Sequence, residues 1–171
     1  MKARIANEHH FETHDGETIF YRHWPSLTEK TKGTIVLLHR GHEHSGRLAH
    51  LVHELNLPEF AFAAWDARGH GLSSGERGYS PSVGTSVRDL QGFIDHIGER
   101  HGAKPEEIAL VAQSVGAVLA AAWVHGYAPT LRALVLAAPA FDVRLYVPFA
   151  RPALRLAQSL RGDFYVKSYS Y

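Results

Sequence analysis

Short, continuous apolar runs alternate along the chain with longer segments in which apolar residues recur every three or four positions. Runs of the first kind are typical of strands covered on both faces of a sheet. Segments of the second kind are typical of helices with one buried face. The pattern predicts strands at 33–39, 60–66, 108–113 and 131–139, and helices at about 46–56, within 82–102 and at 115–127.

The N-terminal part of the chain carries two strand-like runs on either side of a turn signal. The stretch HFETHDGETIFYRHW, residues 10–24, is rich in Phe, Thr, Ile and Tyr and has Asp15-Gly16 near its centre. An Asp-Gly pair between two such runs is typical of a β-hairpin. Strands and helices alternate after it, which predicts an α/β fold with a mostly parallel sheet and flanking helices.

Composition narrows the class of protein. A chain of 171 residues with 45% hydrophobic content predicts about one folded, soluble domain. Its 18 basic and 17 acidic residues leave a formal net charge of +1, so we expect no nucleic-acid partner. The sequence has no cysteine, which excludes disulfides and cysteine-bound zinc. It shows neither a signal-peptide pattern nor an apolar run of about 18 residues, so we expect a cytoplasmic location.

A serine stands where the predicted strand 108–113 gives way to the predicted helix 115–127. Ser114 is the centre of AQSVG, which matches the pattern G-x-S-x-G except that Ala112 replaces the first glycine, while Gly116 is kept. In that pattern the serine occupies a tight strand-to-helix turn whose strained backbone lifts the hydroxyl clear of the sheet. The alternative is that Ser114 only caps the helix, because serine is a favoured N-cap residue.

Two further stretches follow predicted strands in the same order along the chain. LLHRGHEHSGR occupies residues 37–47, and WDARGHGLSSG occupies residues 65–75. With AQSVG behind them, they resemble the monoacylglycerol lipase and lysophospholipase branch of the α/β-hydrolases, which carries an HGxGEHSGRY-like loop, then D-x-x-G-H-G-x-S-x-G, then G-x-S-x-G. The resemblance covers most of the chain. The segments HRGHEHSGR and AQSVGAV also resemble the hydrolase half of bacterial bifunctional proteins that are fused to a methyltransferase domain.

The resemblance implies a serine hydrolase that cleaves carboxylic esters through an acyl-serine intermediate, with a small ester or lipid-like substrate, no cofactor and no metal. Ser114 would be the nucleophile, and the backbone N–H groups of Gly41 and Val115 would form the oxyanion hole. Arg40 and His42 stand where the related proteins carry glycine, so this loop departs from the family pattern. The matching residues of the second motif are expected to turn the chain beneath the site without a catalytic role: Asp66, Gly69, His70, Gly71 and Ser73.

The acid and base of a triad do not follow the serine in the order that this fold requires, which is serine, acid, histidine. The only histidine after Ser114 is His125, about three turns along the predicted helix and so ~16 Å away. No histidine follows Asp142 or Asp163. The sequence is therefore interpreted as the N-terminal part of a larger hydrolase, inactive and prone to aggregation by itself, whose activity and solubility a longer polypeptide restores.

Residues 1–140 are accordingly interpreted as part of the hydrolase core and residues 141–171 as the start of a cap. The second segment mixes apolar side chains with arginines. It is expected either to form a lid that weakly contacts acyl chains or an anionic lipid surface, or to pack as a helix on the sheet. The oligomeric state and the natural substrate are left open.

Two other functions remain as alternatives. A non-catalytic domain that keeps the fold and only binds a ligand is one, because fold does not dictate function. A metal-dependent hydrolase is the other, suggested by three histidines close together after the first central strand and by three more in the N-terminal segment. A motif of the metallo-β-lactamase type needs an acid and a histidine where Gly46 and Arg47 stand. The histidines concerned are His9, His10, His14, His39, His42 and His44.

Overall fold

The computed structural model describes residues 4–141, 156 and 159–160. Contacts divide the chain into two compact units, Met1–Ala140 and Phe141–Tyr171. Most of the expected cap, with Asp142 and Asp163, lies outside the described residues, so its assignment as a cap stays a prediction. The fold and the candidate site below belong to the first unit.

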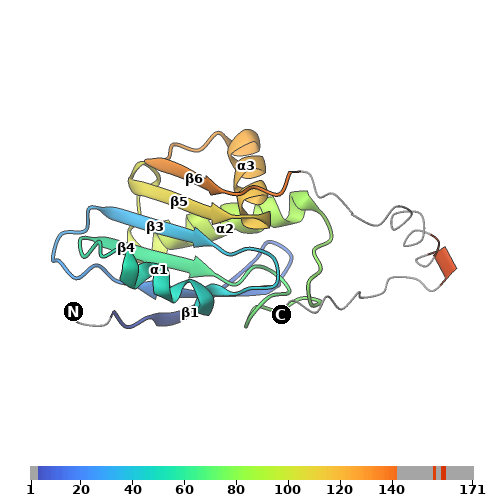
Figure 1. Cartoon of the computed structure of the whole chain (residues 1–171), viewed down its shortest axis with the longest axis horizontal. Helices are drawn as coiled ribbons and strands as arrows, with labels where there is room; N and C mark the ends of the chain where they lie inside the picture. The colour runs from blue at the N-terminus through green and yellow to red at the C-terminus, as the bar shows by residue number, and fades with distance from the viewer. Residues whose placement is uncertain (1–3, 142–155, 157–158, 161–171) are drawn as a thin grey trace. The chain divides into compact units, whose positions relative to one another are not determined.

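Six strands in the described part of the chain form one sheet in the order β1-β2-β4-β3-β5-β6 (Figure 1). The β1–β2 and β2–β4 pairs are antiparallel, while β3 pairs in parallel with β4 and β5, and β5 with β6. The predicted hairpin and mostly parallel sheet are thus confirmed. The strands are β1 (Asn7–Glu12), β2 (Thr18–Trp24), β3 (Gly33–Leu38), β4 (Phe60–Trp65), β5 (Ile108–Gln113) and β6 (Ala133–Ala137).

Helices cover both faces of the sheet, with α1 on one face and α2 and α3 on the other (Figure 1). The helix predicted at 46–56 is a 3₁₀ turn, η1 (Ser45–Leu48), followed by the short α1 (Ala49–Glu54). The ring of His44 accepts a hydrogen bond from the N–H of Gly46, which caps the 3₁₀ turn. The other helical elements are α2 (Val83–His101), η2 (Pro105–Glu107) and α3 (Val115–Tyr127).

Gly102 ends α2. Gly102 takes a left-handed conformation with φ 69°, and its N–H donates to the carbonyl of Gly98. A residue without a Cβ adopts that conformation at low cost, which is why glycine is common directly after a helix. Gly98 remains inside the helix.

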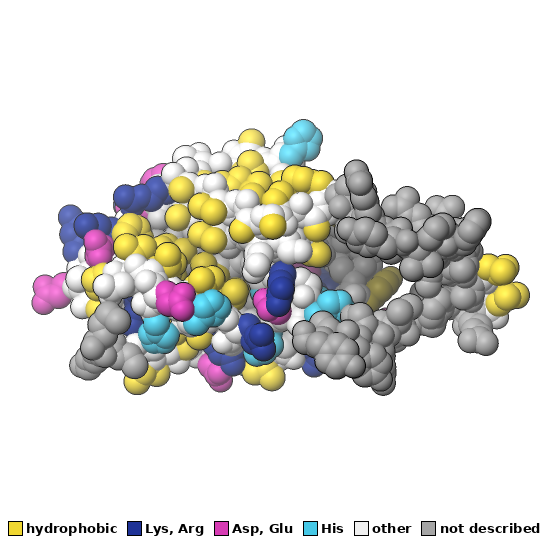
Figure 2. Space-filling model, in the orientation of Figure 1, with side chains coloured by type: hydrophobic (Ala, Val, Ile, Leu, Met, Phe, Trp, Pro, Cys, Tyr) yellow, Lys and Arg dark blue, Asp and Glu magenta, His cyan; other side chains and the backbone are white. Residues whose placement is uncertain are grey.

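Two apolar clusters, one on each face of the sheet, form the core. All six residues of β3 are buried, as the continuous apolar run predicts. β6 is equally apolar but mostly exposed, because it forms an edge of the sheet among the described strands. Figure 2 shows hydrophobic side chains gathered over β5 and β6 on the face that carries α1.

The parallel strands bring the loops of interest to one edge of the sheet. β3, β4 and β5 end at residues 38, 65 and 113, within the first two residues of the three motif segments. In open α/β sheets ligand sites lie outside the carboxyl ends of the strands, where such loops meet. In the described part of the chain, no helix combines the length and apolar character that crossing a membrane requires.

Candidate active site

Ser114 connects β5 to α3 in a conformation that side chains rarely adopt. Its φ is 54° and its ψ is −115°, and its side chain makes no capping hydrogen bond to the helix. An ordinary N-cap would have extended dihedrals and a side-chain bond to the first turn. The predicted strained turn is therefore confirmed, and the capping alternative is wrong.

Backbone hydrogen bonds hold this turn from both sides. The N–H of Ser114 donates to the carbonyl of Ala137 at the end of β6 over 2.9 Å. Its carbonyl accepts from the N–H groups of Ala117 and Val118 over 3.1 and 3.2 Å. The strained residue thus satisfies its own backbone groups, and its hydroxyl is left free of the helix terminus.

Small residues flank Ser114 because the helix starts against a neighbouring strand. A Cβ added to Gly116 would lie 2.5 Å from the carbonyl oxygen of His39 and 3.2 Å from the Cβ of Leu38. No side chain fits there without displacing the backbone. Ala112 is buried in β5, and its methyl group is accommodated where the pattern has its first glycine.

The loop after β3 contacts the start of α3. A Cβ on Gly41 would lie 3.7 Å from the Cγ2 of Val115, which is van der Waals distance. Gly41 and Val115 also line the same cavity. The two residues expected to supply the oxyanion hole are therefore neighbours, on the two elements that flank Ser114.

His39 is a structural residue at the end of β3 rather than a free base. Its Nδ1 lies 2.7 Å from the carbonyl oxygen of Arg40, and its Nε2 lies 3.0 Å from the backbone nitrogen of Ala67. The first nitrogen therefore donates and the second accepts. Burial lowers the pKa of His39, which favours this neutral form. With both nitrogens engaged, the ring ties the ends of β3 and β4 together.

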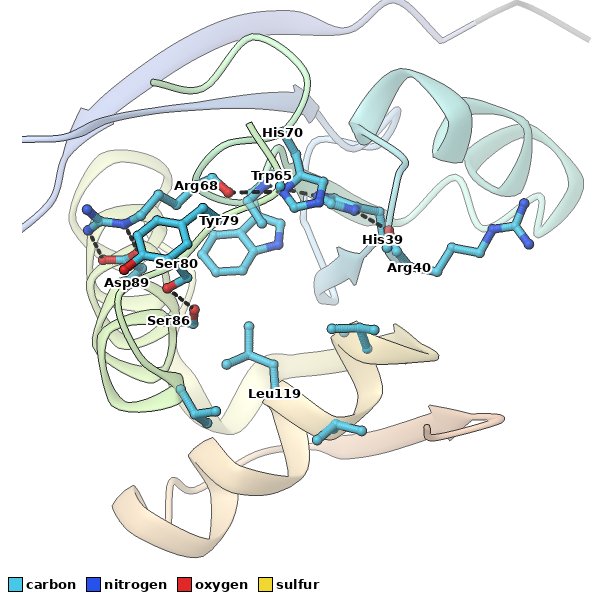
Figure 3. A pocket seen from close by; sticks show the side chains of 17 residues that line it. His39, Arg40, Trp65, Arg68, His70, Tyr79, Ser80, Ser86, Asp89 and Leu119 are labelled. Atoms are coloured by element: carbon cyan, nitrogen blue, oxygen red, sulfur yellow. Dashed lines mark hydrogen bonds and ion pairs between the residues drawn. The ribbon is translucent and has the colours of Figure 1, made fainter. Parts of the chain in front are cut away.

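The departures from glycine in this loop have different consequences. His42 has a φ of 61°, so it takes a left-handed conformation at a position where the related proteins carry glycine. Arg40 is not among the residues with positive φ. Its side chain extends away from the cavity (Figure 3) and forms a 2.8 Å ion pair with Glu43. Of these two residues, His42 and not Arg40 takes the left-handed conformation.

The second motif, residues 65–75, forms a turn that its own hydrogen bonds stabilise, as expected of a structural segment. The carboxylate of Asp66 is buried and accepts hydrogen bonds from the N–H groups of Ser45 and Leu72 over 2.6 and 2.9 Å. The hydroxyl of Ser73 donates to the carbonyl of Asp66 and accepts from the N–H of Phe20. A Cβ on Gly71 would collide with the Asp66 carboxylate.

An arginine in the same loop anchors it to α2. Arg68 donates two 2.9 Å hydrogen bonds to the carboxylate of Asp89, and both side chains are almost fully buried. The same guanidinium binds Asp15 in the hairpin turn over 2.7 and 2.9 Å. These hydrogen bonds raise the pKa of Arg68 and lower the pKa of Asp15. The sequence did not predict this ion-pair network of Arg68, Asp89 and Asp15.

A cavity of about 230 Å³ opens beside the serine turn (Figure 3). Val115 and Gly116 line it directly after Ser114, although Ser114 itself is not part of the lining. One wall is apolar, and the other is formed by the polar loops after β3 and β4. The apolar lining includes Trp65, Tyr79, Val83, Val118 and Leu119. Such a cavity suits an apolar group held next to polar chemistry.

Comparison with known proteins decides the family. The family model described as serine aminopeptidase, S33 (Hydrolase_4) matches residues 29–170. The chain belongs to this S33 family of α/β-hydrolases. Together with the monoglyceride lipase relatives described next, this match confirms the monoacylglycerol lipase-like resemblance that the three motifs predicted.

Individual relatives of this S33 chain are longer than it is. The uncharacterized protein YnbC of Escherichia coli (strain K12) is 59% identical over 167 residues, which cover 98% of this chain and 28% of YnbC. Monoglyceride lipase of Mus musculus is 34% identical over 111 residues, 64% of this chain and 35% of the lipase. A soluble variant of monoglyceride lipase from Saccharomyces cerevisiae, solved with a substrate analog, has the same fold, with a TM-score of 0.70 and 18% identity over 94% of this chain and 53% of that one.

Proposed function

We propose that this chain carries the nucleophile and the oxyanion hole of a serine hydrolase that cleaves carboxylic esters. Ser114 attacks the ester carbonyl, forms the acyl-serine bond and releases the alcohol, and water then hydrolyses the acyl group. The N–H groups of Gly41 and Val115 stabilise the negative charge that develops on the carbonyl oxygen. A small ester with an acyl chain of short to medium length is the substrate class we assign.

The conformation of Ser114 is the observation that supports this proposal most. A positive φ at serine costs of order 1–3 kcal/mol, which a helix cap would not require. The strain is useful if it presents the hydroxyl at the carboxyl edge of the sheet, next to the oxyanion donors. The apolar wall with Val118 and Leu119 then accepts the acyl chain.

A general base is the remaining requirement. His39 has both ring nitrogens engaged, and His125 stands in the last turn of α3, at the opposite end of that helix from Ser114. We propose that the acid and the base come from sequence beyond Tyr171 in a longer polypeptide, as the motif order of this fold implies. A cytoplasmic location and weak contact of residues 141–171 with lipid belong to the same proposal.

Steady-state hydrolysis of p-nitrophenyl butyrate by the full-length polypeptide tests the proposal. Ser114→Ala should lower kcat/KM by about 10⁴-fold or more, because a triad acts as a unit. Ser26→Ala removes a hydroxyl from an exposed loop and should leave kcat/KM unchanged. Full activity of Ser114→Ala would reject the assignment.

A pair of substitutions at Gly41 tests the oxyanion hole. Gly41→Ala keeps the N–H, and its methyl group meets Val115 only at van der Waals distance, so activity should be retained. Gly41→Pro removes the N–H donor and should lower kcat by about 10²–10³-fold. Circular dichroism confirms that both variants are folded. Equal kcat values for the two variants would exclude Gly41 as a donor.

A further inference from the structure

A cluster of three histidines lies on the hairpin side of the sheet, away from Ser114. His9 is in β1, His23 is in β2 and His101 is the last residue of α2. Register places Asn7 opposite His23 and His9 opposite Tyr21, so His9 and His23 share the sheet face that packs against α2. We call these three residues the three-histidine cluster. Two strands, β4 and β3, separate β2 from β5.

One nitrogen from each of the three rings lies within 4.8 Å of the other two. The rings of His23 and His101 stack with centroids 3.8 Å apart, and the ring of His9 meets His101 edge-on at 5.2 Å. Zinc–nitrogen bonds of ~2.0–2.1 Å in a tetrahedral site place two ligand nitrogens about 3.3 Å apart. Because each lone pair lies in the plane of its ring, the stacked rings of His23 and His101 must turn out of their parallel arrangement for both nitrogens to bind one ion.

Two ring nitrogens in the cluster are buried without a partner. The Nε2 atoms of His9 and His23 make no hydrogen bond in the described part of the chain, and His23 is only 7% exposed. Buried polar atoms in folded proteins almost always have a partner, and an orphaned one calls for an ion or a water. A metal ion would satisfy both lone pairs together.

Burial affects all three rings of the three-histidine cluster. Burial, with neighbouring histidines as a further cause, lowers the pKa of His23 to about 3 and of His101 to about 4. The pKa of His9 is also lowered, by burial and by Arg100.

A tyrosine holds the third ligand in place. The hydroxyl of Tyr21 lies 2.9 Å from the Nε2 of His101 and 3.0 Å from the Nε2 of His96. This contact leaves Nδ1 of His101 as its ligand atom. Groups that hydrogen-bond a ligating histidine orient the ring and raise metal affinity.

We propose that the three-histidine cluster binds one zinc-like transition-metal ion and clamps the hairpin to the end of α2. Three imidazoles without a carboxylate favour zinc, copper or nickel over magnesium or calcium. The other group of three potential ligands in the described residues, His14, Asp15 and Asp89, is excluded because Arg68 already occupies its carboxylates.

Titration of tag-free, chelator-treated protein with Zn²⁺ against a chromophoric chelator tests this site. Wild type should bind one ion, and His9→Gln and His101→Gln should each weaken binding by about 10-fold or more. Both positions are partly exposed, so at least one variant is expected to fold. Arg100→Gln should tighten binding, because Arg100 places a positive charge beside the rings.

Two exposed histidines on α1 provide the matched control. The double variant His50→Gln/His53→Gln removes an i, i+3 pair that offers an alternative surface site. This variant should bind zinc like wild type, and zinc should raise the Tm of both proteins but not of His9→Gln. Loss of binding in the α1 variant, or unchanged binding in His9→Gln and His101→Gln, would overturn the proposal, as would absence of binding to wild type.

Discussion

Gly116 shows at the residue scale why the serine turn needs a small neighbour. Gly116→Ala should destabilise the fold by roughly 1–3 kcal/mol, because its Cβ would meet the His39 carbonyl at 2.5 Å. Gly126→Ala in the same helix has open space around the new Cβ and should stabilise by up to about 1 kcal/mol. Urea denaturation measures both. Equal effects of the two substitutions would mean that the contact between α3 and β3 is loose.

His39 makes part of the stability depend on pH. Burial lowers its pKa below the usual 6.5, so the unfolded chain binds a proton that the folded chain does not. The contribution of His39 to the free energy of unfolding is present above about pH 6.5, and it is lost as the pH falls toward the pKa of His39 in the folded chain. His39→Gln, which can still accept from Ala67, should lose less unfolding free energy between pH 7 and pH 5 than wild type. Equal losses, measured by urea denaturation at each pH, would contradict this role.

At the scale of elements, the Arg68 network joins the loop after β4 to α2 and the hairpin turn. Asp89→Asn should destabilise by roughly 3 kcal/mol, because it leaves a buried guanidinium with one carboxylate fewer. Asp15→Asn should cost clearly less, since Asp15 is much more exposed. Thermal unfolding measures the difference. A larger loss in Asp15→Asn would mean that the hairpin turn, not α2, fixes the loop.

The type and order of the elements were predictable, and the reason lies in their periodicity. Continuous apolar runs predicted the parallel strands. The helix predicted at 115–127 is α3, which has the same bounds. The start of η1 was not predictable, because it depends on a side-chain cap by His44. Arg68 was missed because its partner Asp89 lies 21 positions along the chain. The three-histidine cluster was missed because it needs the hairpin register and the end of α2 together.

At the scale of the whole sheet, β6 presents an apolar edge among the strands that the structure describes. Val135 is 49% exposed and pairs in register with Val111, on the face where Figure 2 shows hydrophobic side chains gathered. Exposed apolar edges promote association between chains. Val135→Lys should therefore reduce concentration-dependent association in sedimentation velocity, whereas Leu27→Lys, at an exposed loop residue, should not. Equal association of the two variants would mean that the chains associate through a surface other than β6.

Ser114 as an activated nucleophile is tested most directly by covalent labelling of the full-length polypeptide with a fluorophosphonate. Digestion and mass spectrometry should find one adduct, on the hydroxyl of Ser114, because this serine stands at a strained turn beside the oxyanion donors. Ser114→Ala should remain unlabelled, and Ser26→Ala should be labelled like wild type. An adduct on another serine, or undiminished labelling of Ser114→Ala, would contradict the assignment.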